Sequence, residues 1–465
     1  MVFSEPVFMF LFLPVVLLIY YAVPFRFKNA VLFFTGLLFY SWGEPVYVLI
    51  MIISTLIDYL AGRAMDRYDS SPKIRKTALI VSVVMNLSLL GVFKYSGFLI
   101  DSVNSLFNIT LSNPNLPLPI GISFFTFQSM SYTIDLYRRN ITVQKSFIKF
   151  AAFVTMFPQI VAGPIVLYDD VAKELEERKI DFDSISNGIS IFICGLCKKV
   201  LIANSVGELW TAVKETDYSA LPAATAWLGI LAFTLQIYFD FSGYSDMAIG
   251  LGKMLGFNFP QNFDYPYNSK TVSEFWRRWH MTLGGWFKSY VYFPLGGSRH
   301  GKAKTIRNLL IVWFLTGMWH GASWNFIIWG VYYGIILILE KFVFASVIKK
   351  LPTLITRIYT LLAVVIGWVI FEIYSPASMF DFIGSMFGTS GIFYDSFTVN
   401  ALHNYSVTLI IAAVIATGLP LKLWKKITCN RKLDGICIAS EAIGMIASVA
   451  YLVDASYNPF LYFNF

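Results

Sequence analysis

His320 has the most unusual position of the ionisable side chains in this sequence, because it lies in the middle of a long apolar run. The run from Leu309 to Leu339 contains no Asp, Glu, Lys or Arg residue. An ionisable group in such a segment is a functional candidate, since a charge at the centre of a bilayer costs roughly 2.5–3.5 kcal/mol. A neutral imidazole can accept a proton from a hydroxyl near neutral pH, so His320 is predicted to act as a general base. The alternative is a core histidine that only hydrogen-bonds a backbone carbonyl.

Two glycines and a second histidine extend this candidate site. Gly317 and Gly321 stand before and after His320 and leave room where a substrate or a neighbouring helix could approach. His280 follows Trp279 in a basic, aromatic stretch. It could orient a substrate, relay a proton or only reach the membrane interface.

Asp240 and Asp246 are two further carboxylates within apolar sequence. Ser242 and Gly243 lie between them, and these residues are expected to break the helix, so that the carboxylates cap backbone groups or pair with a base. We therefore predict that Asp240 and Asp246 support the site, together with Trp319 beside His320 and Trp279 beside His280.

Metal and nucleophile chemistry find no support in the sequence. Cys194 and Cys197 form a CxxC pair, but it lies in an apolar run with no second Cys or His pair nearby. The sequence contains no serine nucleophile elbow, phosphate-binding P-loop or zinc triad. No metal site is predicted.

The composition is that of a polytopic helical membrane protein. Of the 465 residues, 57% are hydrophobic, 17% are aromatic and only 14% are charged, whereas a soluble domain carries roughly 25% charge. The apolar runs are continuous rather than alternating, which disfavours a β-barrel. The net charge of +8 is attributed to Lys and Arg residues in cytoplasmic loops. The expected partner of these residues is membrane lipid, and no nucleic acid is predicted to bind. We expect a multi-pass protein of the cell membrane.

The apolar runs predict an all-α fold with about nine to twelve membrane-embedded helices, some of them re-entrant or kinked. The runs lie at 7–23, 29–43, 45–62, 77–107, 117–136, 147–167, 187–206, 222–250, 308–340, 354–374, 405–421 and 436–453. Basic clusters at 63–76 and 422–432 are predicted to face the cytoplasm. The charged segment 169–183 is predicted to be a surface helix.

The stretch from Lys253 to Arg307 combines many Lys and Arg residues with Trp and Tyr. This combination is typical of a segment that lies on the cytoplasmic leaflet. A membrane-contacting loop without chemistry would have the same composition.

Several blocks stand in order along the chain: Pro119–Gln128, Phe157–Pro164, Tyr238–Asp246, Glu274–His280, Tyr292–Gly297, Gly317–Gly321 and Tyr457–Phe465. Trp42–Pro45 fits the same pattern. Together these blocks resemble the membrane-bound O-acyltransferase superfamily, and most of all the branch of the alginate O-acetyltransferase membrane subunit.

The resemblance implies one membrane acyltransferase domain over residues 1–465, with N-terminal helices at 1–115, a motif-bearing core at 116–340 and C-terminal helices at 341–465. It implies that His320 is the catalytic histidine and His280 the second histidine of the site. Acetyl-CoA would be the acyl donor, and Arg277 and Arg278 could bind its phosphates.

The resemblance also implies partners: an extracytoplasmic SGNH-type esterase-like protein and a polysaccharide synthesis or export complex. The implied reaction moves an acetyl group from a cytoplasmic thioester donor across the membrane for O-acetylation of an exported cell-surface polysaccharide. Transfer of D-alanine toward teichoic acid is an alternative. A transporter whose His320 and Asp240 line a substrate path, or a passive scaffold of an export complex, is a further alternative.

Overall fold

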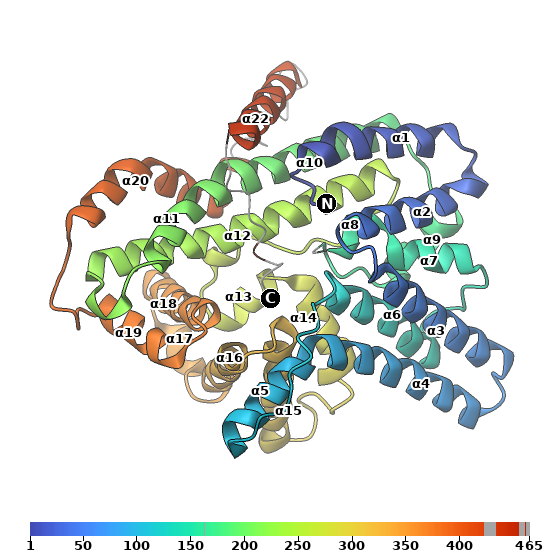
Figure 1. Cartoon of the computed structure of the whole chain (residues 1–465), viewed down its shortest axis with the longest axis horizontal. Helices are drawn as coiled ribbons and strands as arrows, with labels where there is room; N and C mark the ends of the chain where they lie inside the picture. Colours follow the sequence, from blue (N-terminus) through green and yellow to red (C-terminus); the bar gives the residue numbers. More distant parts are fainter. Residues whose placement is uncertain (162, 423–433, 455–460, 462–465) are drawn as a thin grey trace. The chain divides into compact units, whose positions relative to one another are not determined.

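The computed structural model describes residues 1–161, 163–422, 434–454 and 461, and its regular secondary structure there is entirely helical (Figure 1). Helices suit a lipid environment because each one satisfies its own backbone hydrogen bonds. The predicted all-α fold is confirmed. The motif block at Tyr457–Phe465 lies outside the described residues except for Leu461, as does most of the basic cluster at 422–432.

Eight helical segments are long and apolar enough to cross a membrane, so the protein is a multi-pass membrane protein. Phe8–Ala22, which contains η1 (Phe8–Phe12) and α1 (Leu13–Ala22), is a shorter apolar segment. The eight are α3 (Val48–Arg67), Pro72–Phe107 with α4 (Pro72–Leu90) and α5 (Ser96–Phe107), Phe182–Lys214 with α10 (Phe182–Cys197) and α11 (Ser205–Lys214), α12 (Ala223–Met254), α16 (Trp324–Phe342), α18 (Thr353–Glu372), α20 (Ser396–Ala416) and Gly435–Asp454 within α22 (Asp434–Asp454).

Shorter or more polar helices lie between these segments. They are α2 (Phe25–Gly43), α6 (Ile122–Tyr137), α7 (Phe147–Thr155), α8 (Phe157–Ile160), α9 (Tyr168–Glu176), α13 (Val272–Arg278), α14 (Met281–Phe287), α15 (Lys302–His320), α17 (Ala345–Lys350) and α19 (Pro376–Met386). Helix α9 confirms a surface helix in the charged segment, although it ends at Glu176.

The chain folds into two compact units. The first comprises Met1–Phe192 with Tyr244–Pro260, and the second comprises Ile193–Gly243 with Gln261–Phe465. In the first unit, helices α3, α4 and α6 surround the carboxylate of Asp58. Ser82 Oγ donates to it at 2.5 Å, and Asn86 Nδ2 donates to both of its oxygens at 2.9 Å. These hydrogen bonds offset the free-energy cost of burying the carboxylate.

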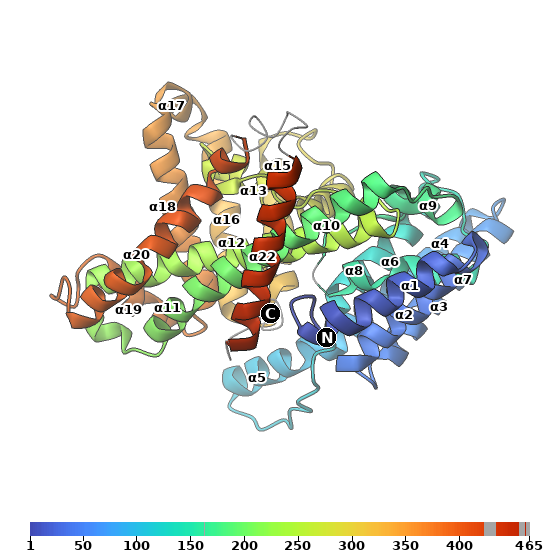
Figure 2. The same cartoon turned by 90° about the horizontal axis from the view of Figure 1, so that it is seen from above.

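In the second unit, α16 packs against α13, α15 and α18, and α13 also packs against α18. Figure 1 and Figure 2 show where these helices lie. The apolar run 308–340 folds into two helices, α15 and α16, because the chain breaks at Gly321. A Cβ atom on Gly317 would overlap the backbone oxygen of Phe326, and one on Gly330 would overlap that of Trp313. Small residues therefore let these two helix backbones approach closely.

Two other predicted runs also differ from the structure. The run 147–167 is divided, because α7 ends at Thr155 and the short helix α8 begins at Phe157. The expected break at Ser242 and Gly243 does not occur, and α12 continues through both residues. A Cβ on Gly243 would approach Gly195 O at 2.7 Å and Lys199 N at 3.0 Å, so this glycine permits close packing of α12 instead of ending it.

Candidate active site

His320 is the last residue of α15, and its side chain is buried among aromatic rings. Its ring centroid lies 4.9 Å from that of Trp329 on α16 and 5.4 Å from that of Phe371 on α18. Trp319, its neighbour on α15, lies 5.1 Å away. The break after α15 thus places the imidazole at a helix end, where three helices enclose it.

His280 lies between α13 and α14 in a left-handed backbone conformation, with φ 43° and ψ 54°. Left-handed conformations are uncommon outside glycine, although histidine adopts them more often than most residues. Nδ1 lies 3.0 Å from Asn262 Oδ1, and the ring packs edge-on against Phe241 with 4.8 Å between centroids. Burial lowers the pKa of His280 to about 3, so the ring is neutral at physiological pH.

Trp319 brings the two histidines into one cluster. Its ring centroid lies 5.8 Å from that of His280 and 5.1 Å from that of His320. Trp279 is also buried and lies 4.9 Å from Trp368 on α18. The structure therefore brings together four residues predicted from sequence: His280, His320, Trp279 and Trp319.

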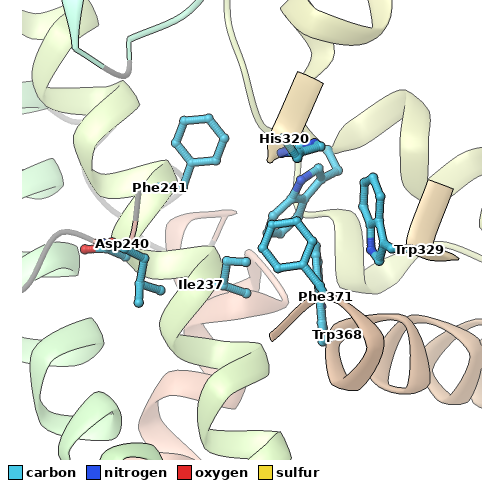
Figure 3. Close-up of a pocket in the computed structure, with 9 residues that line it drawn as sticks. Ile237, Asp240, Phe241, His320, Trp329, Trp368 and Phe371 are labelled. Carbon is cyan, nitrogen blue, oxygen red and sulfur yellow. The ribbon is translucent and has the colours of Figure 1, made fainter. Parts of the chain in front are cut away.

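A narrow cavity of about 20 Å³ opens beside His320 (Figure 3). This volume holds about one water molecule. Asp240, Ile237 and Phe241 approach the cavity from α12. The full lining consists of Ile237, Asp240, Phe241, Trp279, His320, Trp329, Trp368, Phe371 and Leu461.

Asp240 is held by a buried cation. Lys199 Nζ lies 2.7 Å from Asp240 Oδ1, and the two side chains are only 2% and 3% exposed. Lys199 also donates to Asn204 Oδ1 at 2.8 Å, and the backbone N–H of Leu461 donates to Asp240 Oδ2 at 2.9 Å. Asp240 therefore lines the cavity as half of an ion pair.

The sequence analysis missed Lys199, although the signal was present. Lys198 and Lys199 interrupt the apolar run 187–206. The chain forms a π-helix there, η3 (Lys198–Asn204), a local geometry that is frequent at functional sites.

Asp246 does not share this arrangement. It lies six positions after Asp240 in the unbroken α12, is half-buried, and does not line the cavity. The expectation that a helix break lets the two carboxylates cap or pair is therefore corrected. A continuous helix keeps them more than one turn apart.

The two arginines proposed for donor phosphates differ in their surroundings. Arg278 is half-buried, and its guanidinium lies 3.0 Å from Asp264 Oδ2 and 3.0 Å from Glu274 Oε1. Arg277 is exposed. Arg277 thus has the more accessible guanidinium for a ligand.

In the described parts of the chain, no three His, Cys, Asp or Glu side chains are grouped as metal ligands. Cys194 and Cys197 are reduced thiols, and Ser448 Oγ donates to Cys197 Sγ at 3.6 Å.

Comparison with known proteins identifies the family. The sequence model of the membrane-bound O-acyltransferase family matches residues 137–382, which include both histidines. The chain is 36% identical over 506 residues to the probable alginate O-acetylase AlgI of Azotobacter vinelandii, and all of both chains is covered. It is 41% identical to the probable alginate O-acetylase AlgI of Pseudomonas aeruginosa, covering 80% of this chain and 72% of the relative.

A relative with a different printed name shows similar coverage. The chain is 30% identical to the peptidoglycan O-acetyltransferase of Helicobacter pylori, covering 100% of this chain and 98% of the relative. The buried histidine cluster thus occurs in a chain that matches O-acyltransferases along its entire length. The protein is a multi-pass O-acyltransferase that belongs to the membrane-bound O-acyltransferase family, in the branch that contains the alginate O-acetylases.

Proposed function

We propose that the protein moves an acetyl group from a cytoplasmic thioester donor, acetyl-CoA, across the membrane for O-acetylation of an exported cell-surface polysaccharide. The relatives support this acceptor class, since their names describe acetylation of alginate and of peptidoglycan. The observation that carries the proposal is the placement of His320 in a narrow, aromatic-lined cavity beside His280 and Trp319.

His320 acts as the general base in this proposal. The imidazole takes the proton of the attacking hydroxyl, and that oxygen forms a bond to the thioester carbonyl carbon. The carbon–sulfur bond breaks, and the proton passes from His320 to the departing thiolate. The acetyl ester and the free thiol of coenzyme A are the products.

Trp329 supplies a hydrogen-bond donor for the charge that develops on the acyl oxygen. Its side chain is fully buried, lines the cavity, and contacts the His320 ring. Among the described residues, its Nε1–H has no hydrogen-bond acceptor. A buried donor without an acceptor is destabilising, and an acyl oxygen in the cavity would satisfy it.

Donor binding on the cytoplasmic side and transfer to the glycan on the extracytoplasmic side involve groups other than the histidines. Arg277 binds donor phosphates through its exposed guanidinium. An extracytoplasmic SGNH-type protein, associated with a polysaccharide synthesis or export complex, completes the transfer to the glycan. Asp240 and Lys199 support the cavity wall as a neutral pair.

The test measures alkali-labile acetate on the cell surface in wild-type, deletion and His320→Ala strains. His403→Ala is the matched control, because His403 is exposed and does not line the cavity. We expect the deletion and His320→Ala to lose the acetate, at equal protein levels, while His403→Ala retains it. Loss in the deletion alone would instead indicate a transporter or scaffold.

A reconstituted assay tests the donor. The full-length protein in lipid nanodiscs, with the SGNH-type partner present, is supplied with radiolabelled acetyl-CoA and an acceptor glycan, and thiol release and ester formation are measured together. General-base catalysis contributes roughly 10²- to 10⁴-fold, so His320→Ala should lower both rates by about that factor. If the unaltered protein forms neither labelled ester nor free thiol, acetyl-CoA is not the donor.

A further inference from the structure

Asn262 determines which nitrogen of His280 carries the proton. Asn262 Oδ1 lies 3.0 Å from His280 Nδ1 and also accepts from Thr282, at 3.3 Å from the backbone N–H and 2.9 Å from Oγ1. A backbone N–H can only donate. The amide atom that faces Thr282 and His280 is therefore the oxygen and not the nitrogen.

An amide oxygen can only accept, so His280 Nδ1 must donate to it. A neutral imidazole carries one N–H, and the buried His280 ring is neutral. The proton is thus on Nδ1, and Nε2 keeps its lone pair.

The backbone around Asn262 holds this contact in place. Met281 N donates to Asn262 O at 2.9 Å, and Asp264 N donates to Arg278 O at 2.9 Å. These two bonds fasten the loop at Asn262–Asp264 to the junction of α13 and α14. Phe241 and Trp319 pack against the imidazole ring. The ring therefore has little freedom to turn and exchange its two nitrogens.

We propose that Asn262 is a positioning residue that fixes His280 as the Nδ1–H tautomer, so that Nε2 can only accept a hydrogen bond. A hydroxyl or an N–H group can donate to Nε2, whereas a carbonyl oxygen, which is also an acceptor, cannot bond it. The effect of this tautomer on acyl transfer rests on the proposed function.

The tautomer can be measured without any reaction. Full-length protein labelled with ¹⁵N-histidine is examined by solid-state NMR in lipid, and the His280 signals are assigned by their loss in His280→Ala. We expect a protonated Nδ1 and a non-protonated Nε2. Asn262→Ala should allow a mixture of tautomers, whereas Asn262→Asp, which keeps an acceptor oxygen, should keep Nδ1 protonated. A protonated Nε2 in the unaltered protein would overturn the proposal.

Kinetics test the role of the tautomer. Loss of the orienting partner of a metal-bound histidine lowers activity by roughly 10- to 100-fold, and we expect Asn262→Ala to lower kcat by a factor of this order. The double variant Asn262→Ala/His280→Ala should have the same kcat as His280→Ala alone. Thr282→Val is the control, because it removes one donor to Asn262 Oδ1 without touching the contact to His280. If the reductions in kcat caused by the two substitutions instead multiply in the double variant, Asn262 acts through fold stability alone.

The two measurements also separate this inference from the proposed function. If the unaltered protein releases no thiol from acetyl-CoA, the donor proposal fails, while the NMR result still decides the tautomer. If the unaltered protein is active and Asn262→Ala retains full activity, the proposed role of Asn262 fails and the proposed function stands.

Discussion

Lys199 and Asp240 form an ion pair across two helical segments, with 2.7 Å between Nζ and Oδ1 and almost no exposure of either side chain. Lys199 belongs to the π-helix η3, and Asp240 lies on α12 and lines the cavity. Pairing lets a charge remain in an apolar interior. The pair therefore adds no net charge to the aromatic lining of the cavity.

Removing one partner of this pair should destabilise the protein strongly. Asp240→Asn leaves the Lys199 ammonium buried without its counter-ion, and the loss of a buried partner costs about 3–5 kcal/mol. Thermal unfolding in nanodiscs measures the change. Asp264→Asn is the control, since the ion pair of Asp264 with Arg278 is at the surface, with side-chain exposures of 47% for Asp264 and 34% for Arg278. This substitution should change stability by less than about 1 kcal/mol. Equal effects of the two substitutions would show that the Lys199–Asp240 pair is not buried.

Glu340 on α16 should determine the position of α13. Its carboxylate accepts from Val272 N at 2.7 Å, from Ser273 N at 2.8 Å and from Ser273 Oγ at 2.6 Å. Hydrogen bonds to a charged group are worth about 1.5–3 kcal/mol each, so Glu340→Ala should lower both thermal stability and transfer activity. Lys341→Ala at the neighbouring exposed position is expected to change neither. Full activity in Glu340→Ala would contradict a role in placing α13.

Gly317→Ala should separate α15 from α16. The added methyl group would overlap the backbone oxygen of Phe326. A side chain could relieve such an overlap by changing its rotamer, but a backbone atom in a helix cannot. Overpacking of this kind costs about 1–3 kcal/mol and should move His320 out of its cavity, with loss of activity. Gly285→Ala on α14 is the matched control, because no atom lies within 4 Å of the added methyl group. It should be neutral or slightly stabilising.

The protein should lose stability in acid because of His280. Burial lowers its pKa to about 3, below the usual value near 6.5, so between these values the unfolded chain binds a proton that the folded chain does not. The stability contributed by the neutral ring is complete above about pH 6.5 and falls by about 1.4 kcal/mol for each pH unit below it. His280→Asn should flatten the pH dependence of unfolding in this window. An unchanged slope would show that other groups dominate the acid response.

Trp329→Phe should lower the rate without abolishing the fold. The substitution keeps an aromatic ring beside His320 and removes the indole N–H that lacks an acceptor among the described residues. Loss of one donor to a developing oxyanion costs about 10²- to 10³-fold in kcat. Trp313→Phe removes an indole of the same size that does not line the cavity, and it controls for lost packing. The same kinetics in both variants would remove Trp329 from the mechanism.

Sequence alone was sufficient for the fold class and for the principal candidate residue. A chain with 57% hydrophobic and 14% charged residues in continuous apolar runs has few stable forms other than membrane helices, because lipid requires internally satisfied backbone. His320 was evident because no Asp, Glu, Lys or Arg shares its apolar run. Ordered motif blocks predicted the family, and the comparisons confirmed it.

Tertiary structure decided how the site is assembled. Hydropathy could not show that α15 ends at His320, because Gly321, Ala322 and Ser323 are not polar enough to interrupt an apolar run. It also could not pair Lys199 with Asp240 or Asn262 with His280, which are 41 and 18 positions apart in the chain. Periodicity determines which face of a helix is apolar, but only the packing of helices against one another determines which polar groups meet in the interior.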